Sequence, residues 1–273
     1  MVAIFRRAAT RFSLDGCAFL AQALAFNAVF AMFPLLLLTI SALGYVYGSN
    51  EGQAKVLSTV GSIAPAFVDM ARNNLANVVA FRSLSSILGI VALWWSSKNF
   101  FLGLRYALNR ALGITANQPY LIDIAWSLIA VPAAGALLAV ASIAPLIVTI
   151  LVHIAHITWL QYLPEIISYA TSFLLVFVVT LVLYAQLPNR RVGWRFGLPG
   201  ATFCAFSWAI IQAGYMLYTA HVNFYRIYGA VSAILALMFW FYLMGIVFLY
   251  GGQLCVATRD AKQAASLAPD KQR

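Results

Sequence analysis

The chain has 273 residues, of which 63% are hydrophobic and 9% carry a formal charge. Soluble domains carry about 25% charged residues, so this composition excludes a water-covered globular domain and predicts an integral membrane protein. Seventeen Lys and Arg against seven Asp and Glu give a net charge of +10. Because cationic residues collect on the cytoplasmic side of membrane proteins, we expect anionic membrane lipids, and no nucleic acid, as partners.

The N-terminal residues 1–15, MVAIFRRAATRFSLD, predict a short amphipathic helix of the membrane interface, with arginines beside an apolar face. The 35 residues that follow, 16–50, carry no formal charge. A helix of that length rises about 50 Å, against a hydrocarbon core of about 30 Å. We predict a first transmembrane helix over about 17–47, an uncleaved anchor that is far longer than a signal peptide. Pro34 removes a backbone hydrogen bond and is the predicted hinge of this helix.

The next part of the chain alternates between polar and apolar segments. Residues 49–83 predict two amphipathic helices outside the membrane. A second transmembrane helix is predicted over about 84–104, and the same helix is expected to continue to Gly113 as a cytoplasmic extension. The third transmembrane helix is predicted over about 120–150, with Asp123 in its first turn, where the helix dipole favours a carboxylate.

The C-terminal half predicts three more transmembrane helices and a polar tail. The helices cover about 165–187, 196–220 and 229–257, and the tail 258–273 is expected to be disordered. Gly197 and four alanines after it recur every four residues in the fifth helix. This spacing predicts a small-residue seam for close helix contact, which suits either the packing of the monomer or a homo-oligomer.

Basic residues are distributed unevenly between the two sides of this pattern. One side carries 13 Lys and Arg and the other carries 4, so the positive-inside rule places both termini in the cytoplasm. The predicted fold is an all-α polytopic membrane protein with six transmembrane helices and an extracytoplasmic amphipathic helical hairpin between the first two. Its parts are an interfacial helix (1–15), a six-helix bundle (16–257) and a cytoplasmic tail (258–273).

Four strings of the sequence have a familiar form: AFNAVFAMFPLLLLTISALG (25–44), WSSKNFFLGLRYALNRALG (95–113), LPNRRVGWRFGLPGA (187–201) and YGAVSAILALMFWFYLMGIVFLYGGQL (228–254). On these strings, in this order, most of the chain resembles the BrkB/YihY family of bacterial inner-membrane proteins. The resemblance implies a six-helix protein of the inner membrane with cytoplasmic termini. That family's molecular role is not established; transport of envelope lipids is a suggestion for it, and its older ribonuclease BN label is regarded as a mistaken assignment.

Residues suited to catalysis are scarce. Two-metal phosphodiester cleavage needs clustered carboxylates, and on the predicted topology Asp15 and Asp123 are the fixed acids of the cytoplasmic side, which disfavours a ribonuclease. His153 and His156 have a spacing that suits a metal, but interfacial polar residues explain the pair equally well. The three cysteines fall in apolar segments and are expected to be packing residues, and phosphate-binding loops and nucleophile elbows are absent. We predict a non-enzymatic protein without catalytic residues, metal or cofactor.

Polar residues at membrane depth are costly in lipid and usually face the bundle interior or a wet cavity. The alternatives are interhelical hydrogen bonds for the amides, snorkelling for Lys98 and dipole capping for Asp123. The hypothesis is that these residues bind substrate at a cavity that attracts an anionic headgroup: Gln22, Asn27, Lys98, Arg105, Asn109, Arg110, Asp123, Gln212, Tyr215 and Gln253. The sequence favours transport, or assisted movement, of an anionic amphiphile such as an envelope lipid. The alternative is a non-transporting membrane scaffold for envelope-assembly proteins.

Overall fold

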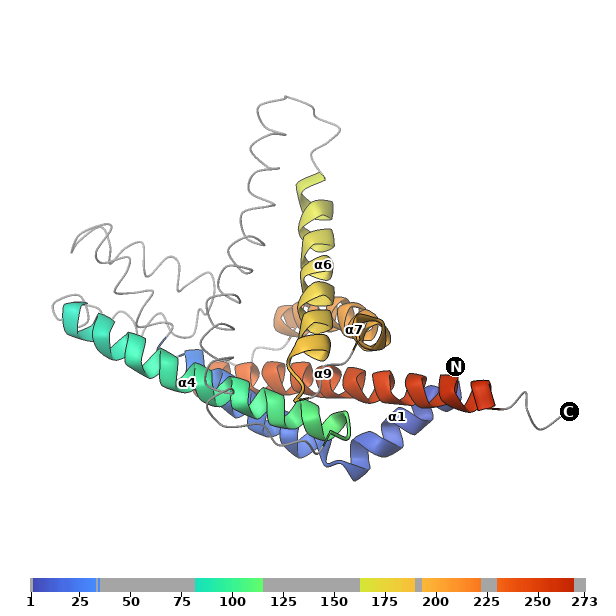
Figure 1. Cartoon of the computed structure of the whole chain (residues 1–273). Coiled ribbons are helices and arrows are strands. Elements are labelled where there is room, and N and C mark those ends of the chain that lie inside the picture. Colours follow the sequence, from blue (N-terminus) through green and yellow to red (C-terminus); the bar gives the residue numbers. More distant parts are fainter. Residues whose placement is uncertain are drawn as a thin grey trace, which may run out of the picture. The chain divides into compact units, whose positions relative to one another are not determined.

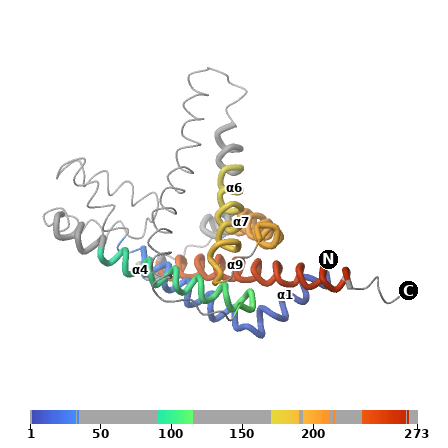
Figure 2. Tube along the Cα trace, in the orientation of Figure 1, coloured from blue at the N-terminus to red at the C-terminus, as the bar shows by residue number. Residues whose placement is uncertain are grey.

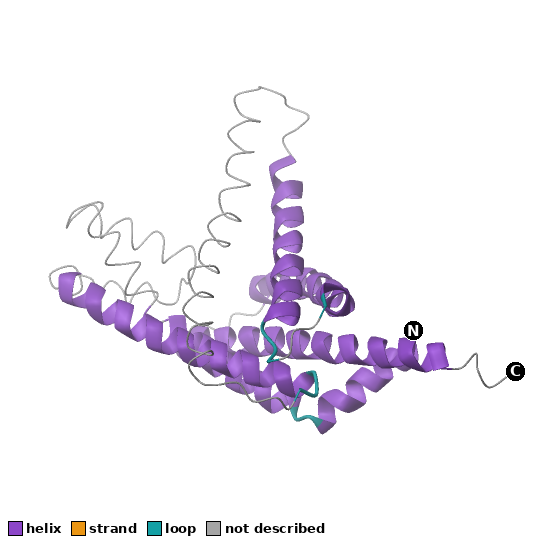
Figure 3. Ribbon diagram, in the orientation of Figure 1, coloured by secondary structure: helices purple, strands orange, loops and turns teal. Residues whose placement is uncertain are grey.

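A computed structural model describes residues 2–32, 34, 82–114, 163–189, 193–221 and 230–267. Within these ranges every regular element is an α-helix and no strand occurs (Figure 3), as the composition predicts. In chain order the helices are α1 (Val2–Leu14), the helix Cys17–Met32, α4 (Arg82–Ala111), α6 (Leu163–Gln186), α7 (Trp194–His221) and α9 (Ala230–Leu267) (Figure 1 and Figure 2).

The observed helices follow the predicted segments closely. The ends of α1, α6 and α7 lie within two residues of the predicted boundaries, and α4 confirms that the second apolar segment and its basic extension form one helix. The prediction of a disordered tail is wrong over residues 258–267, because α9 continues to Leu267. This segment, ATRDAKQAASL from position 257, is rich in residues with high helix propensity. The prediction of disorder relied on its polar composition and did not take this propensity into account.

One described helical segment, Ile234–Ala264 within α9, is long and apolar enough to cross a membrane. The bent pair of α1 and Cys17–Met32 would make a second span if it is counted as one, and Ala170–Gln186 is apolar but shorter. The predicted hairpin falls largely, and the predicted third helix wholly, outside the described residues. The number of six transmembrane helices therefore stays a prediction.

A sharp bend separates α1 from the helix Cys17–Met32. The two axes differ by 69°, and Gly16 at the break has a φ of +65°, a conformation that L side chains rarely adopt. The Asp15 N–H donates to Arg11 O at 2.9 Å and so closes α1. The predicted hinge, Pro34, is helical and buried, but the residues around it lie outside the described ranges, so a kink there stays a prediction.

The chain divides into two compact units, which are described separately. Unit 1 comprises Met1–Ala21, Leu104–Met216 and Met244–Arg273, and unit 2 comprises Gln22–Gly103 and Leu217–Leu243. In unit 2, a Cβ placed on Gly103 of α4 would lie 3.3 Å from Asn27 Nδ2 and 3.7 Å from Leu24 Cδ2. The absence of a side chain at Gly103 therefore lets α4 pack against the helix Cys17–Met32.

The centre of unit 1 is a close crossing of α6, α7 and α9. A Cβ placed on Gly200 of α7 would lie 2.5 Å from Gly251 O and 2.5 Å from Cys255 Sγ. Tyr184 of α6 is fully buried at this crossing, and its hydroxyl donates to Phe248 O at 2.5 Å. Small residues at these positions let the helix backbones approach closely, as in membrane helix pairs.

The predicted small-residue seam of α7 is confirmed in its first half. Gly197, Ala201 and Ala205 are buried inside unit 1, whereas Ala209 is exposed. A Cβ on Gly197 would lie 3.1 Å from Leu181 Cδ1 of α6. This half of the seam therefore serves the packing of the monomer itself.

Candidate functional site

A polar contact of unit 1 joins a buried amide of α9 to the turn after α1. Gln253 on α9 is completely buried, and its Nε2 donates to Asp15 Oδ2 at 2.6 Å. The same nitrogen lies 3.8 Å from Cys17 Sγ. Because Gly16 turns the chain sharply between Asp15 and Cys17, both side chains reach the same amide group.

The end of α4 lies next to this contact. A Cβ on Gly252, the neighbour of Gln253, would lie 3.5 Å from Leu108 Cδ1 and 3.7 Å from Ala111 Cβ. The helix stops there because Gly113 has a φ of +67°, and the Ile114 N–H donates to Asn109 O at 2.8 Å. This glycine cap is a common helix ending.

The last turns of α4 carry two basic residues and an amide. Arg105 is 5% exposed and Asn109 is 9% exposed, whereas Arg110 is exposed. Asn109 Oδ1 accepts a hydrogen bond of 2.9 Å from the backbone N–H of Asn189, which follows α6. We call the set Asp15, Arg105, Asn109, Arg110 and Gln253 the polar junction.

The polar junction keeps one acceptor available. Within the described part of the chain, Gln253 Oε1 has no hydrogen-bond partner, although the side chain is completely buried. A buried acceptor without a donor costs free energy of about 1–3 kcal/mol. A donor such as water or a headgroup hydroxyl would satisfy it, so the junction can accept a polar group.

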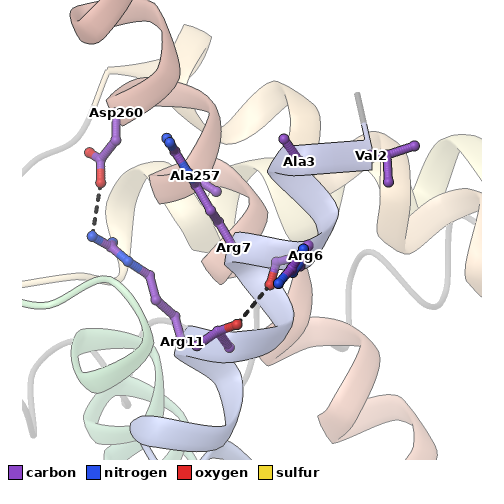
Figure 4. A pocket seen from close by; sticks show the side chains of 8 residues that line it. Val2, Ala3, Arg6, Arg7, Arg11, Ala257 and Asp260 are labelled. Carbon is purple, nitrogen blue, oxygen red and sulfur yellow. Dashed lines mark hydrogen bonds and ion pairs between the residues drawn. The ribbon is translucent and has the colours of Figure 1, made fainter.

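A groove lies on another part of unit 1, between α1 and the C-terminal end of α9 (Figure 4). Its volume is about 690 Å³, and its lining consists of Val2, Ala3, Arg6, Arg7, Thr10, Arg11, Ala257 and Asp260. Arg11 Nη2 lies 2.9 Å from Asp260 Oδ2. Arg259 also contacts this carboxylate, with its Nη2 3.2 Å from Asp260 Oδ1. We call this feature the basic groove.

The predicted site residues are distributed over both units. Arg105, Asn109, Arg110 and Gln253 belong to unit 1, whereas Gln22, Asn27 and Lys98 belong to unit 2. In unit 2, Gln22 is exposed and Asn27 is half-buried, and the Lys98 ammonium lies 4.5 Å from the centre of the Trp95 ring. Gln212 and Tyr215 are placed on α7 by their backbone, and Asp123 lies outside the described residues.

Sequence reasoning missed two parts of this arrangement. Asp15 was identified as an acid of the cytoplasmic side but not as the partner of Gln253, which lies 238 positions away. The arginines of 1–15 were identified, but the wall of the basic groove formed by α9 was not, because its charged residue, Asp260, falls where a tail was predicted. The expectation for the cysteines is confirmed: Cys17, Cys204 and Cys255 are all buried and unpaired in disulfides.

Two acids of unit 1, Asp15 and Asp260, have structural partners. Asp15 accepts from Gln253 and Asp260 pairs with Arg11. Within the described ranges, no group of three or more His, Cys, Asp and Glu is placed to hold a metal ion. His153 and His156 lie outside those ranges.

Several known bacterial proteins are similar in sequence to this chain. A ribonuclease-like protein, YfkH, of Bacillus subtilis is 25% identical over 85% of this chain and 86% of its own length. A UPF0761 membrane protein of Xanthomonas campestris is 27% identical over 98% of this chain, which spans 64% of the length of that relative. A UPF0761 membrane protein of Pseudoalteromonas translucida is 33% identical over 41% of this chain. No solved structure is significantly similar to the chain.

The family comparison covers almost the whole chain. The family model described as virulence factor BrkB matches residues 8–273. This range includes the basic groove's arginine at position 11, the polar junction and all the strings that carry the resemblance. The chain therefore belongs to the virulence factor BrkB family and is a bacterial membrane protein.

Proposed function

We propose that this protein binds an anionic amphiphile, such as an envelope lipid, in the bacterial inner membrane and moves it or assists its movement. In this proposal the protein is not an enzyme, and it crosses the membrane six times with both termini in the cytoplasm. The observation that carries the proposal is the polar junction, with a buried guanidinium and a buried amide among apolar helices.

The charge of Arg105 is the strongest element of this argument. An arginine side chain stays protonated in proteins, so Arg105 keeps a positive charge in the interior of unit 1. Ionisable residues buried inside helical membrane proteins are rare, and they often line a path for substrate or ions. Arg105 is 5% exposed, and one turn later Asn109 adds a buried amide. Together they favour an anionic ligand that also forms hydrogen bonds.

The surface of the helices supports lipid as the surrounding medium. On α6 and α7 of unit 1, Leu174 is 60% exposed, Phe206 is 59% exposed and Ile210 is 72% exposed. In the most apolar window of α9, 17% is buried. So many exposed large apolar side chains would be unfavourable in water and are favourable in lipid. An acyl chain of the ligand could pack against the same apolar surface.

The test is lipid movement in reconstituted vesicles. The full chain is inserted into liposomes that contain a fluorescent phosphatidylglycerol, and dithionite reports how fast label from the inner leaflet reaches the outside. We expect the wild type to accelerate this movement, Arg105→Ala to lose most of the acceleration, and Arg195→Ala, an exposed arginine at the start of α7, to retain it. A rate equal to that of protein-free vesicles, together with no binding of anionic lipid, contradicts the proposal.

The scaffold alternative makes a different prediction. A scaffold for envelope-assembly proteins would bind lipid no better than other membrane proteins and would keep its function in Arg105→Ala. It would instead be recovered from the native membrane in a stable complex, as a homo-oligomer or with other proteins. Recovery of such a complex, with no lipid movement by the purified protein, would favour the scaffold.

A further inference from the structure

The basic groove has an unusual balance of charge for a site between two helices. Its lining contains three guanidinium groups, those of Arg6, Arg7 and Arg11, and a single carboxylate, Asp260, which pairs with Arg11 (Figure 4). Asp260 already lies 2.9 Å from Arg11 and 3.2 Å from Arg259 outside the lining, so it leaves the positive charge of Arg6 and Arg7 in excess. Arginine presents a planar fork of N–H donors that matches the oxygens of a phosphate.

The lining of the groove is also amphipathic. Val2, Ala3 and Ala257 supply apolar wall beside the arginines, and Val2 is 83% exposed. The hydroxyl of Thr10 adds a polar group to the lining, and it donates to Arg6 O at 3.1 Å. A ligand with a charged head next to an apolar part would contact both kinds of wall.

The groove lies at the end of α9 that extends past its apolar part. α9 has 38 residues and a length of about 57 Å, whereas a bilayer with its headgroups is about 40–45 Å thick. The charged residues of α9 begin at Arg259, near its C-terminal end. On the proposed topology this end reaches the headgroup level of the inner leaflet, where phosphate groups are concentrated.

We propose that the basic groove is a binding site for a phosphate monoester, held mainly by Arg6 and Arg7. A phosphate monoester carries a charge of about −1.5 to −2 at pH 7, which matches the excess of two arginines better than a phosphodiester with one charge. This inference rests on the proposed function where the monoester is a lipid headgroup, and it assigns that headgroup a first contact. The Arg11–Asp260 ion pair borders the site, and its carboxylate repels the ligand.

The experiment measures dissociation constants of the full chain in detergent micelles for three ligands: dioctanoyl phosphatidic acid, dioctanoyl phosphatidylglycerol and inorganic phosphate. We expect phosphatidic acid to bind about tenfold more tightly than phosphatidylglycerol, because the second charge strengthens the hydrogen bonds to arginine. Inorganic phosphate distinguishes the source of the ligand. Equal affinity for it assigns the site to soluble phosphate monoesters, and much weaker binding assigns it to lipid.

Variants test the position of the site. The double variant Arg6→Gln and Arg7→Gln should weaken phosphatidic acid binding about tenfold, whereas Arg195→Gln with Lys262→Gln, which removes the same charge outside the groove, should change it little. Arg6→Lys with Arg7→Lys keeps the charge but loses the fork, and we expect intermediate binding. Asp260→Asn removes the repelling carboxylate and should tighten binding.

Two results would overturn the inference. One is equal binding of phosphatidic acid and phosphatidylglycerol, and the other is an equal effect of the groove variant and its charge-matched control. Thermal unfolding of each variant serves as the control for an intact fold. A failure of this inference can be told apart from a failure of the proposed function. If Arg105→Ala still abolishes lipid movement while the groove variant binds phosphatidic acid normally, the polar junction remains the functional site and the groove is not one.

Discussion

The crossing of α7 and α9 gives the sharpest prediction on stability. We consider Gly200→Ala, which adds one methyl group where α7 meets α9. The new Cβ would lie 2.5 Å from Gly251 O and from Cys255 Sγ, and 2.9 Å from Tyr184 Cε2. Gly251 O belongs to the backbone of α9 and cannot rotate away, so the two helices must separate.

The expected change in the free energy of unfolding of Gly200→Ala is the sum of two opposing contributions. Overpacking a filled core costs about 1–3 kcal/mol, and the upper end applies because a backbone atom is one of the obstacles. Replacing a helical glycine by alanine contributes about 1 kcal/mol in favour of the helix. The free energy of unfolding of Gly200→Ala should therefore be about 2 kcal/mol lower than that of the wild type.

Gly214→Ala on the same helix is the matched control. Gly214 is exposed, and a Cβ placed on it meets no atom within 4 Å, so the variant should be as stable as the wild type or slightly more stable. The assay is unfolding of the purified protein in mixed micelles by sodium dodecyl sulfate, followed by tryptophan fluorescence. Equal stability of Gly200→Ala and Gly214→Ala would refute the close crossing of α7 and α9.

Three further predictions use the same unfolding assay. Tyr184→Phe removes the hydroxyl that donates to Phe248 O and should lower the free energy of unfolding by about 1 kcal/mol; an unchanged value would contradict the bond. Gly16→Val forces a β-branched residue into a φ of +65° and should cost about 1–2 kcal/mol, whereas Gly16→Asn should cost less, and equal costs would contradict the bend. Asp15→Ala leaves the buried amide of Gln253 without its acceptor and should cost about 1–3 kcal/mol; Asp15→Asn keeps an acceptor oxygen there, so a similar loss for both variants would contradict the contact.

The helices were predictable because each depends on a local signal. A run of apolar residues, an amphipathic pattern before residue 15, and glycines at positions 16 and 113 mark where helices begin and end. The same local reading failed after residue 257, because polar residues with high helix propensity occur both in exposed helices and in tails. The contact of Asp260 with Arg11 of α1 distinguishes a helix from a tail here, and this contact joins positions that are far apart in the sequence.

The candidate site was predictable only in part, because its contacts join distant positions. The polarity of Gln253 identified it as a buried amide, but its partner is set by the turn at Gly16 and by the path of α9. Gly200 and Gly251 are two of 17 glycines in the chain, and nothing local shows that they meet. The predicted seam continued through Ala209 to Ala213. Ala209 is exposed, because a four-residue period drifts around a helix of 3.6 residues per turn.

The contacts that hold α1 on α9 determine whether the basic groove can bind a phosphate monoester without a large loss of stability. The Arg11–Asp260 pair joins side chains that are 45% and 32% exposed, and such a pair contributes at most about 1 kcal/mol. A phosphate that draws Arg11 away therefore removes little stability. α1 remains held by the buried packing of Ala8 with Leu254 and Ala257, and by the Tyr250 hydroxyl, which donates to Phe5 O at 3.0 Å. Because the packing holds the helix and the ion pair contributes little, Arg11 can exchange Asp260 for a ligand while α1 stays in place.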